Sequence, residues 1–137
     1  MSIWTIVLAL FFLMFAAVHG GWEPTPQPAG YPSFWRGAPG RSWLLSRVLS
    51  ESATGPIAQL LWVLPMAGYL AAGLGLLGWF VPTSWWQPLA VGSAAASLLL
   101  AALWWHPYQW ISAVVDAIVL IGVVLPTGWL AIGGIGT

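Results

Sequence analysis

Residues 57–81 read IAQLLWVLPMAGYLAAGLGLLGWFV and contain no charged side chain. A helix needs about 20 predominantly apolar residues to cross the roughly 30 Å hydrocarbon core of a bilayer. Period-2 alternation, which the strands of a membrane β-barrel show, is absent from this stretch. The stretch therefore predicts a membrane-spanning helix.

Three more apolar stretches flank this one, and each approaches or exceeds the length that a bilayer requires. They cover residues 2–18, 88–105 and 110–132. Because the bilayer core offers no water to backbone N–H and C=O groups, such segments must satisfy those groups internally, as helices do. The predicted fold is an all-α integral membrane protein, with four transmembrane helices in a single membrane domain over residues 1–137.

The composition excludes several other classes of protein. The chain has 137 residues, of which 60% are hydrophobic and only 4% are charged, whereas soluble domains carry about 25% charged residues. The formal net charge is zero, which argues against nucleic-acid binding, since that needs a basic surface. The absence of cysteine excludes disulfides, thiol nucleophiles and Cys-ligated metal sites.

Residues 19–56 form the one extended polar segment between predicted spans. Within it, residues 42–52 place Leu44, Leu45, Val48 and Leu49 on one helical face. We expect a short amphipathic helix at 42–52 that lies in the membrane interface.

The orientation follows from three arginines, since cytoplasmic loops of membrane proteins carry an excess of Lys and Arg. Arg36, Arg41 and Arg47 all lie in residues 19–56, and the chain has no other basic residue besides histidine. We therefore expect a bacterial inner (plasma) membrane protein with a cytoplasmic loop 19–56 and both termini on the outer side. The twelve tryptophans are then expected to form two belts at the membrane boundaries, an inner one of Trp22, Trp35, Trp43, Trp62, Trp104, Trp105 and Trp110 and an outer one of Trp4, Trp79, Trp85, Trp86 and Trp129.

Small residues recur at four-residue spacing in the two central spans. Such ridges let membrane helices approach closely where lipid gives no hydrophobic driving force. We expect packing between these helices through Ala67, Ala71 and Gly75 in one and Ser93, Ser97 and Ala101 in the other.

Asp116 is the only acidic residue inside a predicted span. An ionisable residue within a membrane is a functional-site hypothesis by default. The favoured interpretation is a structural ion pair with Arg41 or Arg47, both expected in the same leaflet. A proton or ion path and a contact to another subunit are the alternatives.

His19 and His106 are the only imidazoles, and both fall at the ends of predicted spans. We interpret them as interfacial residues, with axial ligation of a haem or a chlorophyll-type pigment as the alternative, for His106 before His19. Nothing in the sequence requires a cofactor, and the His and carboxylate spacing predicts no metal site. No catalytic motif is present, and no nucleophile–base–acid set is expected to meet.

These observations predict a non-catalytic accessory subunit of a larger hetero-oligomeric membrane complex, of an energy-transducing kind (respiratory or photosynthetic). Its expected role is to stabilise neighbouring subunits and bound lipid or pigment. One alternative is a small homo-oligomeric transporter or channel that uses Asp116. A second is a cofactor-bearing electron-transfer or light-harvesting subunit with His106 as the ligand.

Overall fold

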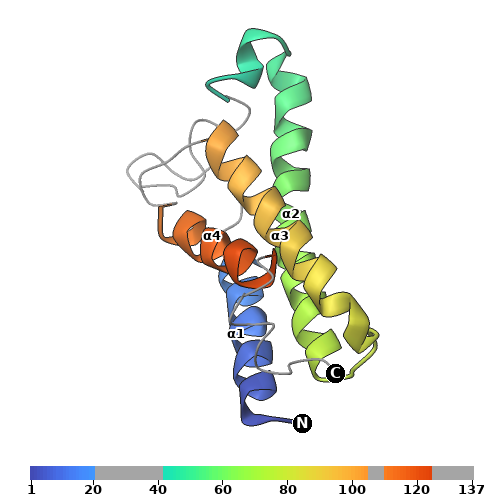
Figure 1. Cartoon of the computed structure of the whole chain (residues 1–137). Helices are drawn as coiled ribbons and strands as arrows, with labels where there is room; N and C mark the ends of the chain where they lie inside the picture. Colours follow the sequence, from blue (N-terminus) through green and yellow to red (C-terminus); the bar gives the residue numbers. More distant parts are fainter. Residues whose placement is uncertain (21–41, 105–109, 125–137) are drawn as a thin grey trace.

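The computed structural model describes residues 1–20, 42–104 and 110–124, and all regular structure in that part of the chain is helical. This confirms the predicted all-helical class at the level of secondary structure. Figure 1 shows the elements, which are the α-helices α1 (Ile3–Gly20), α2 (Glu51–Leu76), α3 (Trp86–Leu103) and α4 (Trp110–Val124), with the 3-10 turns η1 (Leu45–Arg47) and η2 (Thr83–Trp85).

Two of the described stretches are long and apolar enough to cross a membrane, namely Ser52–Leu76 and Thr83–Leu103. The helices α1 and α4 are apolar but shorter. The fourth predicted span was expected to reach residue 132, and its part beyond Val124 lies outside the described residues. The structure therefore provides two helices of spanning length where the sequence predicts four.

The helices α2 and α3 form an antiparallel hairpin, and α1 packs along the half of α2 nearest that hairpin's turn (Figure 1). The helix α4 contacts α3 and runs crosswise to α1 and α2 (Figure 1). This crosswise course departs from the up-and-down path expected of a fourth span.

A glycine ends α2 earlier than the sequence predicts. Gly78 has a left-handed backbone, with φ 70°. The Trp79 N–H donates to the Leu74 carbonyl (2.9 Å), and the Gly78 N–H donates to the Gly75 carbonyl (3.0 Å). These two bonds make a Schellman motif, which satisfies the last carbonyls of a helix and favours glycine at the residue that reverses the chain. The helix therefore stops at Leu76 although the apolar stretch continues to Val81.

The predicted amphipathic helix at 42–52 is wrong. The structure has only the three-residue turn η1, and Ser50 then adopts an extended backbone (ψ 156°) before α2 begins. The helix α2 consequently starts at Glu51 rather than at Ile57.

The segment before η1 is held by the free end of α3. The Ser42 hydroxyl donates to the Leu103 carbonyl (2.7 Å), and the Trp43 Nε1–H donates to the Ala102 carbonyl (2.6 Å). The last four carbonyls of a helix have no partner within the helix, so these two side chains provide hydrogen-bond donors to two such carbonyls of α3. These two bonds join the segment before η1 to the end of α3.

The main core lies where all four helices meet. Aromatic rings from α1 and α2 stack in it, with 5.5 Å between the ring centres of Phe12 and Tyr69. Its buried members are Ala9, Phe12, Phe15, Ala16, Tyr69, Ala72, Leu76, Trp86, Ala90, Ala94 and Val119. A smaller cluster of Leu61, Leu100 and Trp104 lies between α2 and α3 toward the other end.

The predicted ridge of α3 is buried, since Ser93, Ser97 and Ala101 are each less than a tenth exposed. On α2, Ala67 is exposed and Ala71 only half-buried, while Gly75 is buried. The closest approach to α3 is at Gly68, where an added Cβ would lie 2.0 Å from the Ser93 Oγ. The contact stripe of α2 is thus rotated from Ala67 toward Gly68.

Two tryptophans of the predicted belts are buried between helices. Trp86 is 2% exposed and packs against Phe12, with 6.4 Å between their ring centres. Trp104 is equally buried, against Leu61 and Leu100. Their rings fill space between helices, and the two belts at the membrane boundaries stay a prediction.

Candidate functional site

Asp116 is fully buried on α4, at the level where the other three helices come together. Its neighbours are polar side chains from every other helix. We call this set the buried polar cluster, and it consists of His19 on α1, Tyr69 on α2, Ser97 on α3, and Ser112 and Asp116 on α4.

Two hydroxyl groups donate to the Asp116 carboxyl group. The Tyr69 hydroxyl lies 2.5 Å from Oδ1, and the Ser112 hydroxyl lies 3.3 Å from Oδ2. Both carboxyl oxygens are therefore engaged, one by a neighbouring helix and one from within α4.

His19 has a hydrogen-bond partner at each ring nitrogen. Its Nδ1 lies 3.0 Å from the Phe15 carbonyl, and its Nε2 lies 3.4 Å from the Ser97 Oγ. The ring meets Phe15 edge to face, with 4.6 Å between ring centres. The side chain is 6% exposed, so His19 is buried among the helices, and its expected position at the membrane interface stays a prediction.

Ser97 connects the imidazole to the carboxyl group. Besides facing the His19 Nε2, it lies within hydrogen-bonding reach of Asp116. The expectation that a nucleophile, a base and an acid do not meet is therefore wrong, because a serine, a histidine and an aspartate do meet here.

The order of contacts in this set differs from that of a hydrolytic triad. In a triad the carboxylate holds the histidine Nδ1–H, which leaves Nε2 to activate the serine. Here the carboxyl group lies at Ser97, and the His19 Nδ1 faces a backbone carbonyl instead. All three side chains are also buried. In this arrangement the three side chains are enclosed among the described helices.

The other predicted site residues lie apart from the cluster or outside the described residues. Arg47 is exposed on η1, while Arg41 and His106 belong to segments that the structure does not describe. The ion pair with an arginine therefore stays a prediction, as does ligation by His106. Both His19 ring nitrogens have hydrogen-bond partners, and ligation of a haem or pigment by His19 also stays a prediction. Across residues 1–20, 42–104 and 110–124, no group of three potential ligands is placed to hold a metal ion.

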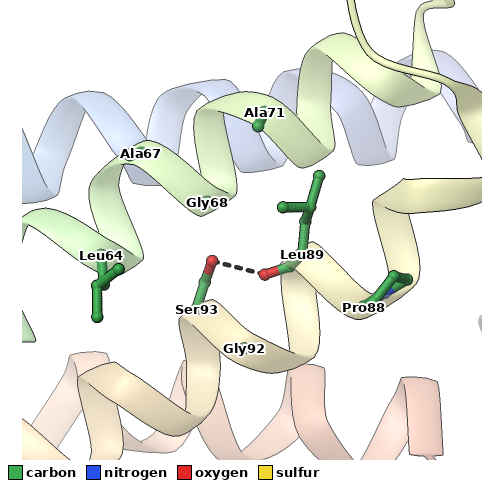
Figure 2. A pocket seen from close by; sticks show the side chains of 8 residues that line it. All are labelled: Leu64, Ala67, Gly68, Ala71, Pro88, Leu89, Gly92 and Ser93. Atoms are coloured by element: carbon green, nitrogen blue, oxygen red, sulfur yellow. Dashed lines mark hydrogen bonds between the residues drawn. The ribbon is translucent and has the colours of Figure 1, made fainter.

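A groove of about 540 Å³ lies between α2 and α3 on the surface of their hairpin. Figure 2 shows the small residues that form its floor and the Ser93 hydroxyl turned back to donate to the Leu89 carbonyl (2.7 Å). The predicted packing residues Ala67 and Ala71 line this groove together with Leu64, Gly68, Pro88, Leu89, Gly92 and Ser93. Asp116 is not among them, so this groove does not lead to the buried polar cluster.

Sequence reasoning identified Asp116 but missed Tyr69 and Ser112 as its partners. A tyrosine within an otherwise apolar span is a usable signal, because a buried tyrosine hydroxyl needs a hydrogen-bond partner. The serine one helical turn before Asp116 is a second signal, because residues four apart lie on the same helix face.

Comparisons of the chain with protein-family models, with curated proteins and with solved structures returned no match. The role of the buried polar cluster is therefore inferred from its residues and their contacts.

Proposed function

We propose that this chain is a non-catalytic accessory subunit of a larger bacterial membrane complex. The single observation that carries the proposal is the distribution of polarity. The most deeply buried side chains include an aspartate, a threonine and a serine, while the exposed ones include many large hydrophobic groups. An arrangement with polar groups inside and apolar groups outside suits lipid or a protein partner as the surroundings.

The outward faces of α1 and α4 support this proposal. Both present continuous apolar stripes, which are Ile3, Val7, Leu10 and Met14 on α1 and Ile111, Val114, Ile118 and Ile121 on α4. Soluble monomers rarely expose contiguous apolar patches larger than a few hundred Å². Lipid or neighbouring subunits would cover these stripes.

The proposed membrane course uses α2 and α3 as full spans. In Figure 1 the start of α1 and the α2–α3 turn lie at one end, and residues 42–50 lie at the other. This supports the proposed topology, in which the N-terminus and that turn face the outer side and loop 19–56 faces the cytoplasm. The helix α1 would be about 27 Å long and α4 about 22 Å at 1.5 Å per residue, so α4 as described is too short to span.

An accessory role is favoured over a transporter because the groove on the α2–α3 hairpin, within the part of the chain that the structure describes, does not include Asp116. A transporter needs a polar path to its coupling site, and the described groove has an apolar lining that omits Asp116.

The proposal is tested by purifying the full chain in mild detergent through a C-terminal tag, followed by mass spectrometry and an absorbance spectrum. We expect larger membrane subunits to co-purify in a fixed ratio, with the absorbance of redox or photosynthetic cofactors. A colourless homo-oligomer would overturn the accessory role and favour the transporter.

Membrane insertion is tested separately with two lysine substitutions. Leu10→Lys places a charge on the outward face of α1, and Ser84→Lys places the same charge in the exposed turn η2. A lysine at the centre of a membrane helix costs about 3 kcal/mol, so only Leu10→Lys is expected to deplete the membrane fraction. Equal recovery of both variants in that fraction would contradict insertion of α1.

A further inference from the structure

His19 and Asp116 belong to the first and last described helices, and Ser97 lies between them. The Ser97 Oγ is 3.4 Å from the His19 Nε2 and also within reach of the Asp116 carboxyl group. Three groups that exchange protons readily therefore form one continuous path across α1, α3 and α4.

The positions of the hydrogens are constrained by the Phe15 carbonyl. A carbonyl only accepts, so the His19 Nδ1 must carry a hydrogen to make its 3.0 Å bond. The variable position of the imidazole is consequently Nε2, which faces Ser97. The Tyr69 and Ser112 hydroxyls donate to the carboxyl group on its other sides.

We propose that His19, Ser97 and Asp116 form a binding site for one proton, which the imidazole and the carboxyl group share through the Ser97 hydroxyl. In the neutral form, the Asp116 O–H donates to the Ser97 Oγ, and the Ser97 O–H donates to the His19 Nε2. In the charged form, the His19 Nε2–H donates to the Ser97 Oγ, and the Ser97 O–H donates to the carboxylate.

The conversion between these forms balances within the three side chains. The carboxyl O–H bond breaks as Ser97 accepts that proton, and the Ser97 O–H bond breaks as Nε2 accepts the other. The net charge is zero in both forms, and no outside donor or acceptor takes part.

Burial explains why the two groups act as a pair. Asp116 is fully buried and His19 is 6% exposed, and a lone charge in such surroundings carries a large desolvation cost. Among the groups that face the site, Tyr69 from α2 supplies a neutral donor. The Arg47 side chain on η1 is exposed, so among the residues that the structure describes, His19 is the buried group that can match a negative Asp116.

The composition of the chain makes this inference directly measurable. Asp116 is the only aspartate, and His19 and His106 are the only histidines. Growth with ¹³C-carboxyl aspartate therefore labels one carboxyl group, and ring-¹⁵N histidine in a His106→Gln background labels one imidazole. The full-length chain in detergent is then examined by infrared and NMR spectroscopy across about pH 5 to 8, the range in which imidazoles titrate.

Near neutral pH, where the site holds its one proton, we expect the carboxylate fraction of Asp116 to equal the imidazolium fraction of His19, because every imidazolium is matched by one carboxylate. Unequal fractions near neutral pH in this otherwise unaltered chain would overturn the proposal. This measurement depends on no substitution within the cluster.

Variants of the cluster sharpen the test. In His19→Gln the carboxylate signal should be lost at neutral pH, since the acceptor for the proton is gone. Ser97→Ala should make the two fractions unequal, and Ser97→Thr, which keeps the hydroxyl, should restore equality. A carboxylate signal that persists in His19→Gln, or equal fractions in Ser97→Ala, would also overturn the shared site.

Discussion

The α2–α3 hairpin and the attachment of α4 are held together in different ways. At the hairpin, Gly68 and Ser93 meet so closely that an added Cβ on Gly68 would overlap the Ser93 hydroxyl. The helix α4 is anchored instead through Asp116, with bonds to Tyr69 and to the Ser97 region. The Gly68–Ser93 contact is sensitive to added side-chain volume, and the Asp116 contacts are sensitive to the loss of a polar group. Each therefore has its own sensitive substitution.

The largest effect is expected at the polar anchor. Asp116→Leu removes the acceptor for Tyr69 and Ser112 and leaves the buried Tyr69 hydroxyl unpaired, at a cost of about 3 kcal/mol in the free energy of unfolding. Asp116→Asn keeps one carbonyl oxygen for Tyr69 and should cost less than half as much. Thermal unfolding in mild detergent, followed by circular dichroism, measures both. Equal losses in the two variants would show that volume, not polarity, holds α4.

A smaller effect is expected at the hairpin. Gly68→Ala forces the Ser93 hydroxyl off its bond to the Leu89 carbonyl, and overpacking of this kind costs about 2 kcal/mol. Adding Ser93→Ala removes the overlapping oxygen, so the double variant should recover most of that stability in the same unfolding measurement. A double variant no more stable than Gly68→Ala alone would place the clash elsewhere.

The smallest effect is expected at the end of α2, where two glycines make a matched pair. An added Cβ has open space at both Gly78 and Gly92, but only Gly78 has a positive φ. Gly78→Ala should therefore destabilise the chain by about 1 kcal/mol, while Gly92→Ala, inside α3, should stabilise it slightly. The difference between their unfolding midpoints tests the Schellman motif directly, and midpoints that shift alike would contradict its role.

The helices were predictable because apolar length alone indicates them, as it does for residues 2–18, which match α1 closely. The ends of the helices were less predictable than the helices themselves. The apolar Trp79–Val81 obscures the stop at Gly78, and an amphipathic pattern at 42–52 suggested a helix where Ser42 and Trp43 serve the carbonyls of α3 instead. The pattern of apolar residues within a segment carries no information about hydrogen bonds to the end of a distant helix.

The candidate site was predictable only in part. Asp116 is conspicuous as the one acid in an apolar stretch, but all members of the cluster other than Ser112 and Asp116 come from three other helices. His19 and Ser97 are 78 residues apart, and no periodicity within one helix indicates that they meet. The rotation of α2 that buries Tyr69 and leaves Ala67 exposed is likewise a property of the packed bundle.

The separation between His19 and Ser97 also bears on how the chain is made. Synthesis proceeds from the N-terminus at about 5–20 residues per second, so α1 leaves the ribosome seconds before the side chains that face His19 exist. Gly68 and Ser93, which meet in the α2–α3 hairpin, are both synthesised before Asp116, so the hairpin contact can form before the cluster is complete. Asp116 is the last member to be made, and its arrival completes the cluster. A nascent chain that ends before α4 therefore contains His19 and Tyr69 but lacks Asp116, the residue that completes the cluster.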